Sequence, residues 1–261
     1  MAEKASVDGG ERGNHIPLGQ HFLVRPEIAG WVAGAISLTR HDTVLEIGPG
    51  HGILTRELLA RTGSVVAIEK DYSLVAELRE TFVAEICSGQ LTLIEQDIRD
   101  FDPVQCSLLG TRYSLVANIP YYITGYIIRK FLTTKHQPAD IAVLVQKEVA
   151  ERIVAGDGKE SLLSLSVKAY GTPGLVRIVK AGAFSPPPKV DSAILRISGI
   201  SSAHFTSPAQ EARFFELLHI AFSQKRKQVG GTLGKMMSNH PLSKKRPEDL
   251  TLEQWIDLTN L

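Results

Sequence analysis

Short apolar runs alternate with amphipathic stretches between residues 43 and 197. The stretches 52–61 and 73–85 place their apolar residues at helical spacing, whereas the runs between such stretches are nearly continuous in Val, Ile, Leu and Ala. Apolar strands that alternate with helices indicate a parallel sheet covered on both faces. The predicted strands are 43–47, 65–69, 91–94, 113–117, 141–145, 175–179 and 193–197.

This order predicts an α/β fold with a Rossmann-like, mostly parallel and doubly wound sheet. Ligands of such sheets bind at the carboxyl ends of the strands, near the point where the strand order switches. We therefore expect the chemistry of this protein in the loops that follow strands.

The pattern changes after residue 200, where no further strand is predicted. Residues 201–208 are typical of a linker, and 211–222 have a strong helical pattern. Thr251 and Gln254 have the spacing of a capping box. We predict a small helical domain over residues 200–261, after a domain over 18–199 and a flexible tail over 1–17.

Composition excludes several classes of protein. No apolar run approaches the roughly 20 residues that cross a membrane, and the polar N-terminus lacks the apolar core of a secretory signal. Two cysteines, Cys87 and Cys106, make no disulfide framework, and no spacing suggests a metal site. The expected location is the cytoplasm.

A nucleic-acid surface, if there is one, must be a local patch, because the 29 basic residues are nearly balanced by 28 acidic ones. The candidate is the run Lys225, Arg226 and Lys227, with a second run at 244–246. On charge alone, a solvated helix face explains these runs equally well.

A glycine-rich loop follows the first predicted strand, where residues 46–52 read Glu-Ile-Gly-Pro-Gly-His-Gly. Gly48, Gly50 and Gly52 permit a tight turn and close approach of a ligand to the backbone. Their spacing differs from the dinucleotide fingerprint, and the absence of a following Lys-Ser/Thr excludes a P-loop. A plain turn would need only one glycine.

Two acidic residues follow the next two strands. Glu69 lies about 20 residues beyond the loop, where a carboxylate can bind the ribose hydroxyls. Asp97 can accept a hydrogen bond from an adenine amine, with Ile98 packing on the ring. This set fits S-adenosylmethionine, a nucleoside without phosphate, and NAD remains the competing ligand at this point.

Asn118-Ile-Pro120-Tyr121 closes the fourth strand. The 6-amino nitrogen of adenine is a poor nucleophile because its lone pair is delocalised. The Asn118 side-chain oxygen and the Pro120 carbonyl could accept hydrogen bonds from its two N–H groups, and Tyr121 could stack on a flipped base. Orientation would supply most of the rate gain, without a strong general base. The alternative is a proline turn beside a core tyrosine.

These residues carry a family resemblance. The chain resembles the KsgA-type rRNA adenine dimethyltransferases over residues 18–233, and the resemblance implies a class I methyltransferase sheet. Residues 46–52 and 118–124 are similar to the family's cofactor loop and catalytic motif. Further similar segments are the entry motif 19–23, the segment 184–192 and the basic helix end 221–227.

The resemblance implies cofactor contacts in the entry motif, the glycine loop and the strand ends, and Phe184 as a second stacking wall beside Tyr121. It implies dimethylation of two adjacent adenosines near the 3′ end of small-subunit rRNA within an immature 30S-type particle, by a monomer. His21 stands where the family often has Asn. The implied cofactor contacts are His21, Leu23, Gly48, Gly50, Glu69, Asp97, Ile98 and Asn118.

Two other functions remain open from the sequence alone, and a third lacks support. An enzyme of the same fold could act on large-subunit rRNA, and a non-catalytic RNA-binding assembly factor could share the fold. An NAD oxidoreductase lacks support, because nothing resembles its fingerprint or a hydride-transfer histidine.

Overall fold

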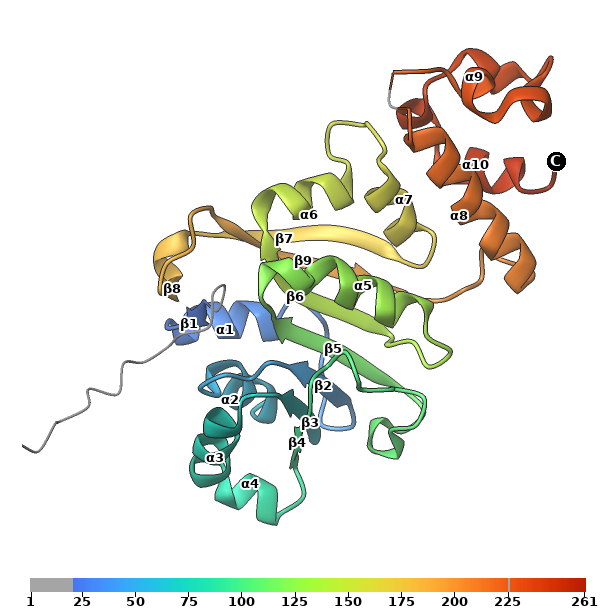
Figure 1. The fold of residues 1–261 in the computed structure, drawn as a ribbon. Coiled ribbons are helices and arrows are strands. Elements are labelled where there is room, and N and C mark those ends of the chain that lie inside the picture. The colour runs from blue at the N-terminus through green and yellow to red at the C-terminus, as the bar shows by residue number, and fades with distance from the viewer. Residues whose placement is uncertain (1–20, 225) are drawn as a thin grey trace, which may run out of the picture.

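The computed structural model describes residues 21–224 and 226–261. At its centre lies a seven-stranded sheet in the order β4-β3-β2-β5-β6-β9-β7 (Figure 1). The first five of these strands are parallel; β9 then pairs antiparallel with β6, and β7 pairs antiparallel with β9. The strands are β2 (Thr43–Ile47), β3 (Ser64–Glu69), β4 (Leu91–Glu95), β5 (Tyr113–Asn118), β6 (Asp140–Gln146), β7 (Thr172–Val179) and β9 (Ser192–Ser198). All seven predicted strands and the mostly parallel sheet are confirmed.

The strand order switches at β2, which pairs with β3 on one side and with β5 on the other. The chain runs outward through β3 and β4, then returns across β2 to begin the other half of the sheet. A crevice therefore opens between the carboxyl ends of β2 and β5, where doubly wound sheets bind their ligands.

Both faces of the sheet carry an apolar cluster. Side chains alternate along each strand, so successive residues belong to opposite faces. Val65 and Ala67 of β3 belong to one apolar cluster, and Val66 and Ile68 belong to the other. The first cluster includes residues of α1 (Pro26–Ala33), α2 (Ile53–Leu59) and α3 (Tyr72–Thr81). The second includes residues of α5 (Thr124–Thr133), α6 (Lys147–Val154) and α7 (Leu162–Lys168).

The single helix expected over 73–85 is in fact two helices, α3 and α4 (Val83–Cys87). The break is at Phe82, whose φ of −115° and ψ of 36° are not helical. The Phe82 ring is buried against Gly52, since a Cβ on that glycine would lie 2.5 Å from a ring carbon. A tertiary contact with the glycine loop therefore accompanies the break in the helix.

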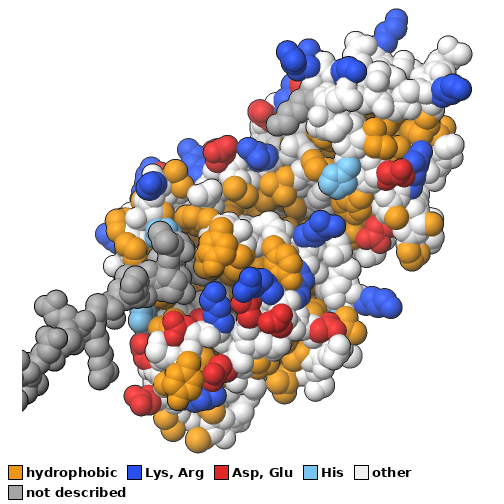
Figure 2. Space-filling model, in the orientation of Figure 1, with side chains coloured by type: hydrophobic (Ala, Val, Ile, Leu, Met, Phe, Trp, Pro, Cys, Tyr) orange, Lys and Arg blue, Asp and Glu red, His pale blue; other side chains and the backbone are white. Residues whose placement is uncertain are grey.

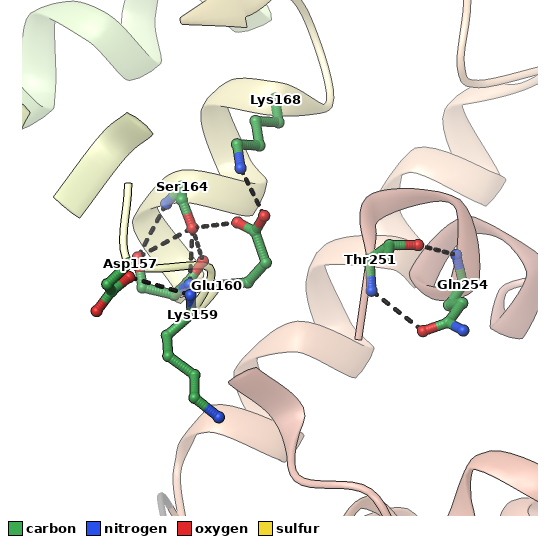
Figure 3. Close-up of polar contacts among 8 residues, drawn as sticks. Asp157, Lys159, Glu160, Ser164, Lys168, Thr251 and Gln254 are labelled. Atoms are coloured by element: carbon green, nitrogen blue, oxygen red, sulfur yellow. Dashed lines mark hydrogen bonds and ion pairs between the residues drawn. The ribbon is translucent and has the colours of Figure 1, made fainter. Parts of the chain in front are cut away.

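Among the described residues after Ser198 there is no further strand, and the regular elements are α8 (Pro208–Phe222), α9 (Val229–Leu233), α10 (Leu252–Leu258) and short 3-10 turns joined by loops. Thr251 and Gln254 form the predicted capping box (Figure 3). Phe214, Leu218 and Trp255 are buried and belong to the same apolar cluster as the α5–α7 face of the sheet. The boundary between a domain over 18–199 and one over 200–261 stays a prediction.

Polar contacts also join the α6–α7 loop to this C-terminal segment. The Glu160 amide donates to the Glu248 carbonyl at 2.9 Å, and Lys159 pairs with Asp249. Glu160 itself is held by Lys168 at 2.5 Å and by the Ser164 hydroxyl at 2.7 Å (Figure 3). Among the described helices, none combines the length and the apolar character needed to cross a membrane.

Candidate active site

A cavity opens at the carboxyl ends of β2, β3, β4 and β5. The two segments that the sequence predicts to form the site, residues 46–52 and 118–121, meet there. A Cβ placed on Gly48 would lie 3.9 Å from the Asn118 carbonyl oxygen. The structure therefore brings the glycine loop and the end of β5 together. The predicted residues that line the cavity are His21, Leu23, Gly48, Gly50, Glu69, Asp97, Ile98, Asn118, Pro120 and Tyr121.

The glycine loop needs its glycines. Gly48, Gly50 and Gly52 have φ values of 66°, 58° and 77°, in the left-handed region that side chains rarely adopt. A Cβ on Gly50 would also lie 3.1 Å from the Phe22 ring. The loop can thus turn under the cavity without filling it.

Glu69 presents its carboxylate to the cavity from the end of β3 and is only 6% exposed. One oxygen accepts hydrogen bonds from the amides of Lys70 at 2.8 Å and Asp71 at 3.0 Å, and the other accepts from the Gly50 amide at 3.3 Å. These main-chain donors fix the orientation of the carboxylate. One lone-pair site remains, on the oxygen that accepts from Gly50, and it can accept a hydrogen bond from a ribose hydroxyl.

Asp97 is fixed by a neighbour that sequence reasoning missed. The side chain of Arg99 donates to both Asp97 oxygens, at 3.0 and 2.6 Å, and the Arg99 amide donates at 2.9 Å. The side-chain hydrogen bonds from Arg99 lower the pKa of Asp97 to about 2. Asp97 is therefore an ionised acceptor at neutral pH, and the largely buried Ile98 lies beside it on the cavity wall.

The Asn118 side chain is oriented by its own amide. Its Nδ2 donates to the His21 carbonyl at 3.2 Å, which leaves Oδ1 as the acceptor that it can offer to a ligand. The Pro120 carbonyl already accepts from the Ile123 amide at 3.1 Å, so one lone pair remains for a second donor. Both atoms can thus serve as acceptors for an amine.

Tyr121 begins a short 3-10 turn, Tyr121–Ile123, and its ring lines the cavity. Burial raises the pKa of its hydroxyl, so the hydroxyl stays protonated. The His21 ring centroid lies 5.7 Å from that of Tyr121, and His21 Nδ1 is 2.8 Å from the Pro186 carbonyl oxygen. His21 and Tyr121 therefore form neighbouring parts of one aromatic wall.

Phe184 does not line the cavity. It lies in β8 (Phe184–Ser185), which pairs with β1 (Phe22–Leu23), and it is 4% exposed within the apolar cluster that contains Leu23. In this structure the ring packs behind the β1–β8 ladder, and a role as a stacking wall stays a prediction.

Glu46 is a second residue whose state the sequence did not reveal. It lies in β2 with no exposed surface, and neither of its oxygens has a hydrogen-bond partner. Burial raises its pKa to about 8, with a further rise from nearby Glu69 and an opposing influence from Thr55. A neutral carboxyl thus lies in the strand two residues before Gly48.

The basic runs lie away from this cavity, in the C-terminal helical segment. Lys225 is outside the described residues, whereas Arg226 and Lys227 are exposed just after α8. The Val229 amide donates to the Lys245 carbonyl at 2.8 Å, so the exposed run 244–246 lies beside the first one. Figure 2 shows Lys and Arg side chains spread over this helical end of the molecule.

Comparison with known proteins adds independent information. A sequence model described as ribosomal RNA adenine dimethylase matches residues 12–258. Ribosomal RNA small subunit methyltransferase A of Dehalococcoides mccartyi is 40% identical over 250 residues, which cover 91% of this chain and 84% of that protein. The protein of the same name from Acaryochloris marina is 35% identical, covering 92% and 94%.

Solved structures agree on the fold. A dimethyladenosine transferase from Plasmodium falciparum superposes with a TM-score of 0.78 at 26% identity, covering 91% of this chain and 96% of the other. The 23S rRNA methyltransferase ErmE gives 0.75 at 24% identity, covering 92% and 98%. The second likeness concerns the fold alone.

Proposed function

The chain belongs to the ribosomal RNA adenine dimethylase family, and we propose that it transfers methyl groups from S-adenosylmethionine to the 6-amino group of adenine in small-subunit rRNA. One observation carries the proposal: Gly48 and Glu69 line the same cavity as Asn118 and Tyr121. A nucleoside site and an amine-orienting site are thus contiguous, as a direct transfer between two bound molecules requires.

The residues fit S-adenosylmethionine. Glu69, fixed by main-chain amides, suits a ribose hydroxyl, and Asp97 with Ile98 suits the edge and face of adenine. The glycine loop offers close backbone approach beside Asn118. When bound, this cofactor supplies an electrophilic methyl group on a sulfonium.

The protein's contribution to the reaction is orientation. Asn118 Oδ1 and the Pro120 carbonyl accept hydrogen bonds from the two N–H groups of the target amine and hold its nitrogen toward the cofactor side of the cavity. Tyr121 stacks on the flipped base, which is worth about 1–3 kcal/mol. No strong general base is required, because the nitrogen becomes acidic once it is alkylated. Correct placement alone lowers the barrier substantially.

We propose that the substrate is the immature 30S-type particle and that two adjacent adenosines near the 3′ end of its rRNA are each methylated twice, by a monomer in the cytoplasm. The neighbouring basic runs 225–227 and 244–246 would bind phosphates of this RNA. The names of the relatives at 35–40% identity favour the small subunit over the large one.

Transfer of labelled methyl to purified particles tests the proposal. Immature 30S particles should accept label, whereas 50S particles and fully methylated 30S particles should not. Asn118→Ala should transfer little label even at saturating cofactor. Label in 50S rRNA would indicate the large-subunit alternative, and cofactor binding without transfer to any particle would support a non-catalytic assembly factor.

A further inference from the structure

Ser192 makes a hydrogen bond to the aromatic residue of the site. Its Oγ lies 2.6 Å from the Tyr121 hydroxyl, with either atom able to donate. Ser192 is fully buried at the start of β9, next to the apolar residues Ala193 and Ile194. A hydroxyl in such surroundings needs a partner, and Tyr121 is the partner that the structure gives it.

The two residues differ in how firmly the backbone holds them. Ser192 lies between two strands, opposite Gln146 of β6 and opposite Val179 of β7. Tyr121 instead belongs to a three-residue turn between β5 and α5, outside the sheet ladders. The hydrogen bond therefore ties the hydroxyl end of a partly buried ring to a strand that is paired on both sides.

We propose that Ser192 is a positioning residue that sets the orientation of the Tyr121 ring for stacking on the target base. The inference rests on the proposed function, because it assigns Tyr121 to the RNA base. The hydrogen bond fixes the hydroxyl end of a ring that lines the cavity beside His21. Without the bond the ring must be ordered when the base binds, at a cost in affinity and rate.

The test compares Ser192→Ala, Tyr121→Phe and the double variant. Each single variant removes the same hydrogen bond and keeps the ring. We expect each to lower single-turnover methylation of RNA about 2- to 10-fold, the range for one hydrogen bond, with cofactor affinity unchanged. The double variant should be no slower than either single one, since residues that share one interaction are not additive.

A spectroscopic readout separates positioning from general stability. With 2-aminopurine at the target position, both single variants should show less quenching by stacking than the wild type. Ser198→Ala, the same substitution at the other end of β9, should leave quenching and rate unchanged. If Ser192→Ala does not fold, Tyr121→Phe alone decides, because it keeps the buried serine.

Additive losses in the double variant, or wild-type rate and quenching in Ser192→Ala and Tyr121→Phe, would overturn the proposed role of Ser192 while the enzyme assignment stands. A wild-type protein that methylates no RNA overturns the proposed function, and this inference with it.

Discussion

We expect stability to fall between about pH 4.5 and pH 8, and replacing Glu46 with glutamine should flatten this fall. Glu46 is fully buried without a hydrogen-bond partner, and its pKa rises from 4.5 to about 8 on folding. In this range the folded state keeps a proton that the unfolded chain releases. The free energy of unfolding therefore falls as pH rises, by up to about 1.4 kcal/mol per pH unit.

Above about pH 8 both states have lost the proton, and this contribution to the slope disappears. Glutamine has nearly the same shape but no titrating proton, so Glu46→Gln removes this dependence alone. For a protein of this size, 1.4 kcal/mol corresponds to a shift in Tm of roughly 3–6 °C. The variant should therefore gain stability relative to the wild type with each pH unit.

Thermal unfolding of both proteins over this pH range measures the difference, in which other titrating groups cancel. Glu80→Gln, on the exposed surface of α3, is the matched control and should track the wild type at every pH. A constant difference in Tm between Glu46→Gln and the wild type would refute the reasoning, because it would mean that Glu46 titrates alike in both states.

Further predictions concern the cavity and the basic runs. Asn118→Ala should slow the first methylation more than the second, because a monomethylated amine has fewer N–H donors; equal losses in single-turnover assays on the two RNAs would contradict this. Gly52→Ala should lower stability by about 2 kcal/mol or more, measured as Tm, since its Cβ would meet Phe82 in a left-handed conformation. Changing residues 225–227 to Glu should weaken RNA binding and reduce its salt dependence but spare cofactor binding; an unchanged salt slope would reject this patch.

The sheet was predictable because its central strands, β2, β3, β5 and β6, are short apolar runs. Burial on both faces imposes that pattern directly on the sequence. The break at Phe82 was not predictable in this way, because the residues on both sides favour a helix and the contact with Gly52 comes from a distant loop. Local pattern specifies the elements, and tertiary packing decides where they end.

The residue types of the site were visible in the sequence, but their partners were not. The glycine loop and Asn118 were predicted from their positions at strand ends. Two hydrogen bonds, from Arg99 to Asp97 and from Asn118 to the His21 carbonyl, depend on side-chain directions in the folded chain. An acid inside the apolar strand 43–47 was the one available signal that Glu46 is buried and neutral.

Phe184 illustrates the opposite case. A motif suggests that it stacks on the target base, and this role stays a prediction; the structure shows its ring buried in the apolar cluster that contains Leu23. Strand pairing sets which face of so short a strand is covered, and a two-residue strand has too little pattern for that face to be predicted.

We propose that Asn118, beside the glycine turn, orients an adenine amine of small-subunit rRNA for methyl transfer. Mass spectrometry of rRNA from a strain lacking this protein, complemented with the wild type or with Asn118→Ala, tests it most directly. We expect dimethyladenosine near the 3′ end of the small-subunit rRNA with the wild type, and its loss in the deletion strain and with Asn118→Ala. Full dimethylation in the deletion strain, or with Asn118→Ala, would contradict the account.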